Sequence, residues 1–310
     1  MTPTILITID VEDWFQVENF KPWIPFSSWP SCELRVEKNT HRLLDLFDSV
    51  ELNNKQQTTG NARTNKLRAT FFVLGWLAER LPGLVREIQA RGHEVASHGY
   101  NHGLGNRQSL EDLKKDLIDS KELLEDIIGE PVYGYRAPSF SVNDDILKVI
   151  EDCGYRYDSS YNSFGMHGRY GKLSVDAYSK KGIAFQISEN FYELPISNLH
   201  FKLQTSNFKL QHLTLPWGGG GYFRMIPFAA FKQGVKRIIK KENTYLFYAH
   251  PWEVDPNQPR VESASAPFKF RHYIHLAETY KKMNRFIFHF NHCRFFTCSE
   301  YLSDADTQSI

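Results

Sequence analysis

The sequence has 310 residues, 41% of them hydrophobic, which is long and apolar enough for a large buried core in one or two domains. Its 37 lysine and arginine residues are balanced by 36 aspartate and glutamate residues. This balance excludes the basic surface that binds nucleic acid or anionic membranes, so we expect a small or neutral partner.

The first residues and the cysteines predict a cytoplasmic protein. Residues 1–9 lack the basic segment of an export signal, and their apolar run stops at Asp10. No run approaches the ~18 apolar residues of a membrane span, so no transmembrane segment is expected. The four cysteines are few and unevenly spaced, as is typical of reduced thiols; they are Cys32, Cys153, Cys293 and Cys298.

A buried strand is predicted at Thr4–Ile9, where β-branched and apolar residues follow one another without interruption. Three carboxylates follow it within four residues, namely Asp10, Glu12 and Asp13. Carboxylates so close together repel one another and resist desolvation, so a cation is the natural compensating group. We therefore expect a functional site at the end of this strand.

Strands and helices then alternate up to residue 158. An aromatic- and proline-rich loop at 15–30 precedes them, and a polar stretch at 53–66 without periodicity interrupts them. The predicted elements are a helix at 37–52, a strand at 69–75, a helix at 81–91, a strand ending at 97, a helix at 109–128 with Ser109 and Asp112 at capping spacing, a strand and loop at 132–141, a helix at 144–153 and a strand at 155–158. Such alternation predicts parallel strands joined by crossover helices, in an open sheet or closed into a barrel.

Two histidines four residues apart, His98 and His102, follow the predicted strand that ends at residue 97. Neutral imidazoles at this spacing can bind one divalent ion such as zinc, and catalytic zinc sites typically offer three protein ligands and one open position. A third ligand must then come from elsewhere in the chain. Alone the pair is weak evidence, because chance can place two of 12 histidines four residues apart.

Residues suited to catalysis recur where predicted strands end. Asp10, His98, Arg136 and Asp158 each fall at the carboxyl end of a predicted strand. In a barrel of parallel strands these ends meet at one rim, where active sites form. The four positions together favour a functional site over four unrelated surface residues.

Beyond residue 158 the pattern is less regular. We predict a strand-like segment at 184–196, close backbone approach at the four glycines 218–221, a helix at 227–240, a buried strand at 244–249 that ends in His250, an amphipathic helix at 270–288 and a last segment at 295–302. We expect residues 1–255 to form the barrel. Residues 256–310 are expected to pack on it as an extension within one structural unit, since no linker precedes them.

The motifs resemble those of the polysaccharide deacetylases, the NodB-like carbohydrate esterases of family 4. The matching segments in family order are Asp10-Val11-Glu12-Asp13, Ser97-His98-Gly99-Tyr100-Asn101-His102, Arg136-Ala137-Pro138, a loose fourth motif at Asp158-Ser159-Ser160 or Glu193-Leu194-Pro195, and Leu246-Phe247-Tyr248-Ala249-His250-Pro251. The resemblance covers about residues 4–255 and points to the branch of allantoinase-like and peptidoglycan-deacetylase-like proteins. Deacetylases of bacterial exopolysaccharide loci look closer still, because they share Gly-Gly-Gly-Tyr-Phe-Arg and His-Pro-Trp-Glu, found here at 219–224 and 250–253.

The resemblance implies an α/β fold, a distorted (β/α) barrel of about seven parallel strands, with a helical C-terminal covering segment. It also implies that His98, His102 and one carboxylate hold a divalent metal, with Zn²⁺ expected and Co²⁺, Ni²⁺, Mn²⁺ or Fe²⁺ as alternatives. The resemblance does not decide whether Glu12 or Asp13 supplies this carboxylate. If the strand continues, Asp10 and Glu12 point to the same face, whereas Asp13 needs the chain to turn, so Glu12 is slightly favoured.

By the same resemblance, Asp10 is the general base and His250 protonates the departing amine. Arg136 is expected to orient Asp10 and keep it ionised, as a paired guanidinium does. Asp158 or Glu193 is expected to orient His250. The products would be acetate and a free amino sugar.

Three functions compete at this point. The first is N-deacetylation of an N-acetylhexosamine unit in a bacterial polysaccharide or its lipid-linked precursor, and the second is hydrolysis of a cyclic amide or imide. The third is carbohydrate binding without catalysis on the same scaffold. His98, His102 and His250 argue against the third function, because a binding protein needs no paired acid and base. The sugar, its linkage and the oligomeric state stay open.

Overall fold

The structure, a computed structural model, describes residues 2–53, 58–59, 62–63, 66–165, 168–205 and 208–307. The strands of the main sheet are β1 (Thr4–Val11), β4 (Thr70–Val73), β5 (Glu94–Ser97), β6 (Gly134–Tyr135), β7 (Tyr157–Asp158), β8 (Ser179–Lys181), β9 (Ala184–Gln186), β10 (Tyr192–Glu193), β13 (Thr244–Ala249) and β14 (Arg294–Phe296). Two small sheets pair β2 (Thr58–Thr59) with β3 (Ala62–Arg63) and β11 (Asn198–Thr205) with β12 (Phe208–Pro216). The helices are α1 (Val36–Asp48), α2 (Gly75–Arg80), α3 (Pro82–Ala90), α4 (Leu110–Ile128), α5 (Asp144–Asp152), α6 (Gly220–Met225), α7 (Phe228–Glu242), α8 (Ala266–Tyr273), α9 (Leu276–His289) and α10 (Cys298–Thr307).

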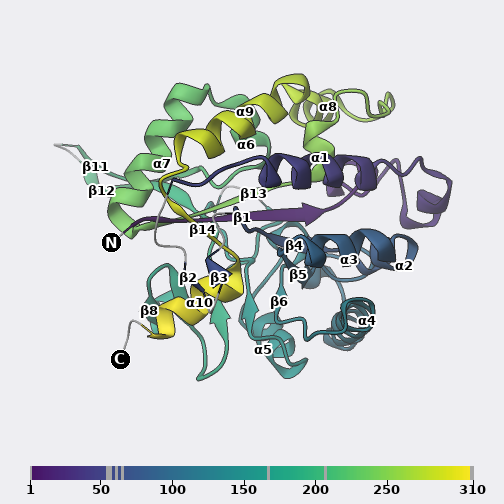
Figure 1. Ribbon diagram of the computed structural model, residues 1–310, viewed down its shortest axis with the longest axis horizontal. Helices are drawn as coiled ribbons and strands as arrows, with labels where there is room; N and C mark the ends of the chain where they lie inside the picture. The colour runs from purple at the N-terminus through teal and green to yellow at the C-terminus, as the bar shows by residue number, and fades with distance from the viewer. Residues whose placement is uncertain are drawn as a thin grey trace.

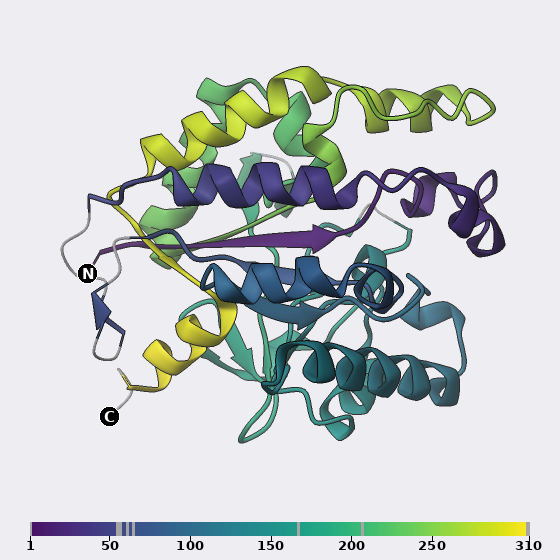
Figure 2. The same ribbon diagram turned by 45° about the vertical axis from the view of Figure 1, so that its right-hand side comes forward.

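The main sheet has the strand order β13-β1-β4-β5-β6-β7-β10-β9-β8, and β14 pairs with the first residues of β1. The seven neighbouring strands from β13 to β10 are parallel, whereas β9 is antiparallel to both of its neighbours, β10 and β8. The sheet curls into a half-barrel, and the helices between its strands lie around the outside (Figures 1 and 2). The predicted α/β fold, a distorted barrel with about seven parallel strands, is thus confirmed.

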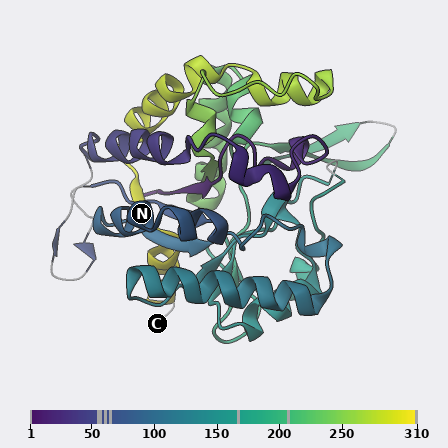
Figure 3. The same cartoon turned by 90° about the vertical axis from the view of Figure 1, so that its right-hand side faces the viewer.

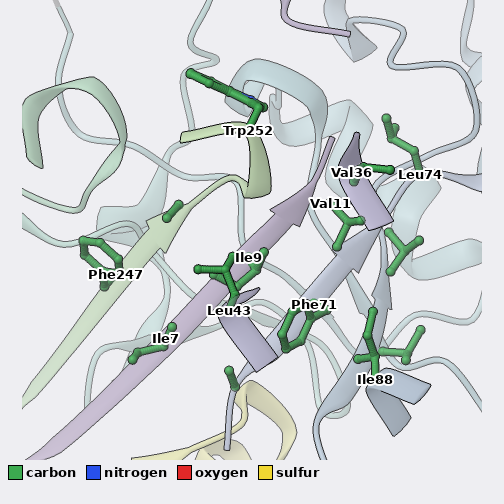
Figure 4. Packing of buried hydrophobic residues seen from close by; sticks show 14 of the residues in the cluster. Ile7, Ile9, Val11, Val36, Leu43, Phe71, Leu74, Ile88, Phe247 and Trp252 are labelled. Atoms are coloured by element: carbon green, nitrogen blue, oxygen red, sulfur yellow. The ribbon is translucent and has the colours of Figure 1, made fainter. Parts of the chain in front are cut away.

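Strand β1 runs through the middle of the molecule, and all eight of its residues are buried (Figure 1). Ile9 and Val11 belong to the large apolar cluster beneath the helices, together with Val36 of α1 and Phe71 of β4 (Figure 4). Because successive side chains of a strand point to opposite faces, Asp10 faces the inside of the half-barrel. The alternation of side-chain direction along β1 therefore places the carboxylate of Asp10 in the concave interior.

The helices predicted from hydrophobic spacing are present as α1, α3, α4, α5 and α7. Ser109 caps α4 as expected, because its Oγ accepts a hydrogen bond from the backbone N–H of Asp112 at 3.0 Å. The short helix α2 was not predicted. Its six residues follow β4 directly and are too few to show a helical period.

Two predicted elements in the second half of the chain are each divided. The single strand at 184–196 is wrong, because a turn in which the N–H of Ile187 donates to the carbonyl of Phe191 at 2.9 Å separates β9 from β10. The single helix at 270–288 is also wrong. His275 has a left-handed φ of 52°, and this residue separates α8 from α9.

The C-terminal segment 256–310 contributes to the main sheet through β14, which pairs with Thr4 to Leu6 of β1. The predicted boundary at residue 255 stays a prediction. The hairpin of β11 and β12, which was not predicted, projects from the body (Figures 1 and 3). Much of the polar stretch 53–66 lies outside the described residues. In the part of the chain that the structure covers, no helix combines the length and apolar character needed to cross a membrane.

The glycines at 218–221 bring backbone against backbone, as the predicted close approach requires. Gly219 forms a bridge with Tyr248 of β13, and the N–H of Tyr248 donates to the carbonyl of Gly218 at 2.8 Å. A Cβ atom on Gly219 would lie 1.9 Å from the Tyr248 carbonyl oxygen, and the φ of Gly219 is 140°. Only glycine fits this position without moving β13.

We expect Gly219→Ala to lower the free energy of unfolding by about 2 kcal/mol or more, because the new methyl group collides with β13 and strains the backbone. Gly83→Ala is the matched control, since Gly83 lies in α3 with no atom within 4 Å of the added Cβ. That change should be neutral or stabilising by about 0.5–1 kcal/mol. Urea denaturation of both variants measures the difference, and equal stabilities would contradict the expectation.

Candidate active site

Polar side chains from four strands meet at one end of the half-barrel. Asp10 lies near the end of β1, while His98, Arg136 and His250 directly follow β5, β6 and β13. Figure 3 views the molecule from the side to which the arrow of β1 points in Figure 1, so it faces these carboxyl ends. A cleft opens there, and Asp10, Glu12 and His250 are among its lining residues. Asp10, His98 and Arg136 are three of the four residues predicted to share one rim, and they meet here together with His250.

Glu12, His98 and His102 form the candidate metal centre. The Oε1 atom of Glu12 lies 3.0 Å from the Nε2 atoms of both histidines. One ligand atom from each residue lies within 4.8 Å of the others, and all three residues are buried. Two imidazoles and one carboxylate are a known ligand set of catalytic zinc sites. These residues therefore fit a divalent metal such as Zn²⁺.

The protein environment orients both histidine rings. The Nδ1 atom of His98 is 2.7 Å from the carbonyl oxygen of Arg136. Because a carbonyl can only accept, Nδ1 carries the proton and the lone pair of Nε2 is left for a metal. The turn from His98 to His102 is held by Asp116 of α4, whose Oδ2 accepts the backbone N–H of Tyr100 at 3.0 Å. These hydrogen bonds therefore orient both histidines of the candidate metal centre.

Glu12 reaches the histidines through a turn. Strand β1 ends at Val11, and the N–H of Glu12 donates back to the carbonyl of Asp10 at 2.9 Å. Burial alone would raise the pKa of Glu12, but the nearby imidazoles of His102 and His250 hold it well below its usual value. Glu12 is thus an ionised carboxylate at neutral pH, as a metal ligand must be.

Asp13, the alternative third ligand, does not reach the metal centre. Its Oδ1 accepts the N–H of Trp14 at 2.8 Å, and its Oδ2 accepts the N–H groups of Arg35 and Val36 at 2.6 and 2.8 Å. These bonds tie the loop after β1 to the first turn of α1. Burial raises the pKa of Asp13 to about 6 in spite of the hydrogen bonds. Asp13 therefore has a structural position, and the expectation that left it open as a ligand is corrected.

Asp10 is held from behind by Arg136, which is completely buried. Nη1 of Arg136 donates to Asp10 Oδ1 at 2.6 Å and to Thr8 Oγ1 at 2.7 Å. Nε and Nη2 of Arg136 donate to the carbonyl and the hydroxyl oxygen of Ser159 at 2.9 and 2.8 Å. The second oxygen of Asp10, Oδ2, lies 3.8 Å from Nε2 of His250. One carboxylate oxygen is thus anchored, and the other is left on the side of the cleft.

His250 is oriented by Glu253, which sequence reasoning missed. Nδ1 of His250 lies 2.7 Å from Glu253 Oε1, which also accepts the backbone N–H of His250 at 3.1 Å. Oε2 of Glu253 accepts a hydrogen bond from Nε of Arg224 at 2.7 Å. The imidazole also stacks on Trp252 with ring centroids 5.2 Å apart. These contacts turn the Nε2 atom of His250 towards Asp10 and Glu12, at 3.8 and 4.0 Å.

The carboxylates around His250 favour its charged form. Burial lowers the pKa of His250, but Glu12, Glu253 and Asp10 outweigh burial and raise the pKa to about 9. Burial alone would raise the pKa of Glu253, but the positive charges of Arg224 and His250 bring it below its usual value. At neutral pH in the absence of metal, His250 is therefore a cation and Glu253 its ionised partner.

Neither Asp158 nor Glu193 orients His250, so that expectation was wrong. The two residues lie opposite each other on β7 and β10 and are fully buried. Glu193 Oε1 accepts the N–H groups of Ser160 and Tyr161 at 3.1 and 2.8 Å, and Asp158 Oδ1 accepts the hydroxyl of Ser160 at 2.7 Å. Burial and the charge of Asp158 raise the pKa of Glu193 well above its usual value. This pair joins two strands behind the site.

A signal for Glu253 was present in the sequence. His250 and Glu253 are three residues apart at the start of the short 3-10 helix η6 (Pro251–Val254), which is the spacing of a capping box. Arg224 gave no comparable local signal, since it lies 29 residues away on α6. It could be linked to Glu253 only through the fold.

Two family descriptions match the chain. Residues 37–157 match the family described as polysaccharide deacetylase. Residues 159–303 match a family described as a domain of unknown function, DUF3473. The first match contains His98, His102 and Arg136, while Asp10 and Glu12 precede it and His250 lies in the second.

Curated relatives match about a third of the chain. The chain is 35% identical over 94 residues to a peptidoglycan-N-acetylglucosamine deacetylase of Bacillus cereus, which covers 30% of this chain and 44% of that protein. It is also 30% identical over 95 residues to a chitooligosaccharide deacetylase of Azorhizobium caulinodans. This match covers 30% of this chain and 45% of that protein. The chain thus spans less than half the length of these relatives.

Solved structures share the fold at low identity. A candidate polysaccharide deacetylase from Mycobacterium smegmatis matches with a TM-score of 0.56 at 18% identity, over 100% of this chain and 92% of that chain. PuuE allantoinase matches with a TM-score of 0.53 at 13% identity, over 96% of this chain and 88% of that chain. At these identities the likeness shows the fold alone, and it supports the curled half-barrel.

The geometry predicts that Glu12 and not Asp13 binds metal. We expect Glu12→Gln to weaken Zn²⁺ binding by about 100-fold or more, because it removes the carboxylate from a site of one carboxylate and two imidazoles. Asp13→Asn should keep the wild-type affinity and instead lower the melting temperature, because it weakens the bonds to Arg35 and Val36. Calorimetric zinc titration and thermal unfolding measure the two effects. Loss of zinc binding in Asp13→Asn alone would reverse the assignment.

Proposed function

Residues 37–157 belong to the polysaccharide deacetylase family, and from this premise we propose that the protein is a metal-dependent hydrolase that removes N-acetyl groups from an N-acetylhexosamine-containing saccharide. The observation that carries the proposal is the meeting of Glu12, His98 and His102 with Asp10 and His250 at one cleft. Amide hydrolysis needs an activated water and a proton for the leaving nitrogen. This site offers a group for each task.

Glu12, His98 and His102 are the residues that would hold the metal. When bound, such an ion polarises the amide carbonyl and makes a water molecule more acidic. Asp10 is the general base, and its Oδ2 is the oxygen that takes the proton from the attacking water. Arg136 supports this role by holding Oδ1 at 2.6 Å, which fixes the carboxylate plane and favours its charged form.

His250 is the general acid in this proposal. Its Nδ1 is engaged by Glu253 at 2.7 Å, so Nε2 is the atom that can give a proton to the substrate. When the C–N bond breaks, the nitrogen leaves as an amine that has received this proton, and acetate remains. Glu253, which holds Nδ1, and Asp10 also favour the protonated form of His250, because each of them raises its pKa.

The cleft walls suit a sugar. Phe140, Tyr170 and Tyr248 line the cleft, and aromatic rings pack well on sugar rings. The relatives from Bacillus cereus and Azorhizobium caulinodans are named for peptidoglycan N-acetylglucosamine and chitooligosaccharides. The motifs at 219–224 and 250–253 resemble those of exopolysaccharide-locus deacetylases. We therefore include a bacterial exopolysaccharide and its lipid-linked precursor, encountered in the cytoplasm, among the proposed substrates.

Acetate release from chitooligosaccharides and from extracted exopolysaccharide tests the function. We expect release to stop when a chelator removes the metal and to return when Zn²⁺ or Co²⁺ is added back. Asp10→Asn should lower kcat by about 10²–10⁴-fold, because it removes the general base. Glu37→Gln, an exposed carboxylate of α1, is the control and should not change kcat.

Two other results would contradict the deacetylase proposal. Chelator-sensitive consumption of a cyclic imide without acetate release would identify an allantoinase-like hydrolase. Saccharide binding that is unchanged in His98→Ala, with no acetate release from any substrate, would identify a carbohydrate-binding protein.

The pH dependence of kcat/KM tests the role of His250. A general acid must be protonated, so kcat/KM should fall as the pH rises through the pKa of His250. Glu253→Gln removes an anion that raises this pKa, so the falling limb should move to lower pH. Glu37→Gln should leave the profile unchanged. An unmoved limb in Glu253→Gln, in protein with an unchanged circular dichroism spectrum, would show that Glu253 does not tune the acid.

A further inference from the structure

Two arginines that have no part in the proposed reaction line the same cleft. Arg169 lies in the loop before β8, and Arg271 lies on α8 in the C-terminal segment. Both side chains are partly buried. They lie in one lining with Asp10, Glu12 and His250, so a ligand in the cleft meets the guanidinium groups and the reacting groups together.

The surrounding residues hold both arginines in place. Arg169 Nη2 donates to the side-chain oxygen of Asn19. Arg271 shares a side-chain hydrogen bond with Tyr170, and its guanidinium lies 5.6 Å from the ring centroid of Tyr222. Burial lowers the pKa of Arg169, and Arg271 lowers it further because the two positive charges repel each other. Two like charges are thus kept close together at one wall.

The carboxylates of the cleft have other partners. Asp10 is bonded to Arg136, and Glu12 lies between the two metal-site histidines. The Oε2 atom of Glu18 lies 3.9 Å from His102 Nδ1 and 3.6 Å from Lys21 Nζ. Glu18 raises the pKa of Arg169 more than Arg271 lowers it, so its charge partly offsets that of Arg169.

Among the residues that the structure describes, no carboxylate lies within ion-pair distance of Arg169. Within the described part of the chain, the neutral amide of Asn19 is the hydrogen-bond partner of its side chain. A partly buried guanidinium with a neutral partner, next to a second guanidinium, is well suited to an anion. Arginine is the side chain that proteins most often use to bind carboxylates and phosphates in two-point geometry.

We propose that the cleft selects an acetamido sugar that carries an oxyanion, a carboxylate or a phosphate, which Arg169 and Arg271 bind while the acetamido group lies at the metal centre. This inference rests on the proposed function, because it names the class of saccharide that the site accepts. A uronic acid unit and a sugar phosphate, such as the head of a lipid-linked precursor, are two sources of the same chemistry. The overall charge balance of the chain does not reveal where these two guanidinium groups lie.

Calorimetric binding to the zinc-loaded protein tests the inference with four probes. They are N-acetylglucosamine, its 6-phosphate, its 1-phosphate and its uronic acid, in which a carboxylate replaces the hydroxymethyl group of carbon 6. We expect at least one anionic sugar to bind about ten-fold or more tightly than the neutral sugar, and added salt should reduce the difference. The sugar that gains most distinguishes a carboxylate from a phosphate site.

Arg169→Gln and Arg271→Gln should each reduce this preference by about ten-fold, since charge-assisted hydrogen bonds are lost. Arg86→Gln, on the exposed face of α3, is the matched control and should keep the preference. Equal affinities for all four probes, or a preference that survives in both cleft variants, would overturn the inference.

The results also separate this inference from the proposed function. Acetate release without any anion preference would reject the anion site alone. Anion preference lost in the cleft variants, without acetate release from any substrate, would reject the deacetylase proposal and keep the binding site. Thermal unfolding of each variant shows that it is folded.

Discussion

The buried ion pair between Arg136 and Asp10 is the interaction on which the rest of the site depends. A charged guanidinium with no exposed surface is stable only when its donors are satisfied, and here Asp10, Thr8 and both oxygens of Ser159 satisfy them. Breaking such a pair from one side costs about 3–5 kcal/mol, because an uncompensated charge stays buried. The pair therefore fixes β1, β6 and the segment after β7 relative to one another.

Arg136 also joins the two halves of the proposed chemistry. Its side chain holds the carboxylate of Asp10, and its main-chain carbonyl accepts the Nδ1 proton of His98 at 2.7 Å. The proposed general base and one proposed metal ligand are thus positioned by the same residue. His250 lies on the other side of β1 and depends on different support, from Glu253 and Arg224, whose guanidinium also donates to the carbonyls of Arg271, His272 and Ile274. The C-terminal segment thus holds the proposed acid in place as well as covering the barrel.

Much of the fold and part of the site could be predicted from local pattern. The uninterrupted apolar run of β1 and the helical spacing of α4 depend on residues close in sequence, and catalytic residue types at strand ends pointed to one rim. The choice between Glu12 and Asp13 could not be made in this way. Both are carboxylates after the same strand, and only the position of α1 shows that Asp13 binds backbone N–H groups. The link from Glu253 to Arg224 likewise joins residues that come together only in the folded chain.

The way in which β1 is paired has a consequence for the order in which the protein can fold during synthesis. One edge of β1 is shared, with β14 beside its first residues and β4 beside its last, and the other edge pairs with β13. The ribosome makes β1 before β13 and β14, which emerge only after residue 243. Until then the backbone groups along one edge of the apolar strand β1 have no partner strand. Unpaired edges of this kind favour aggregation of nascent chains. Contacts between such distant segments also form slowly. We therefore expect the half-barrel to be completed late, after the local helices have formed.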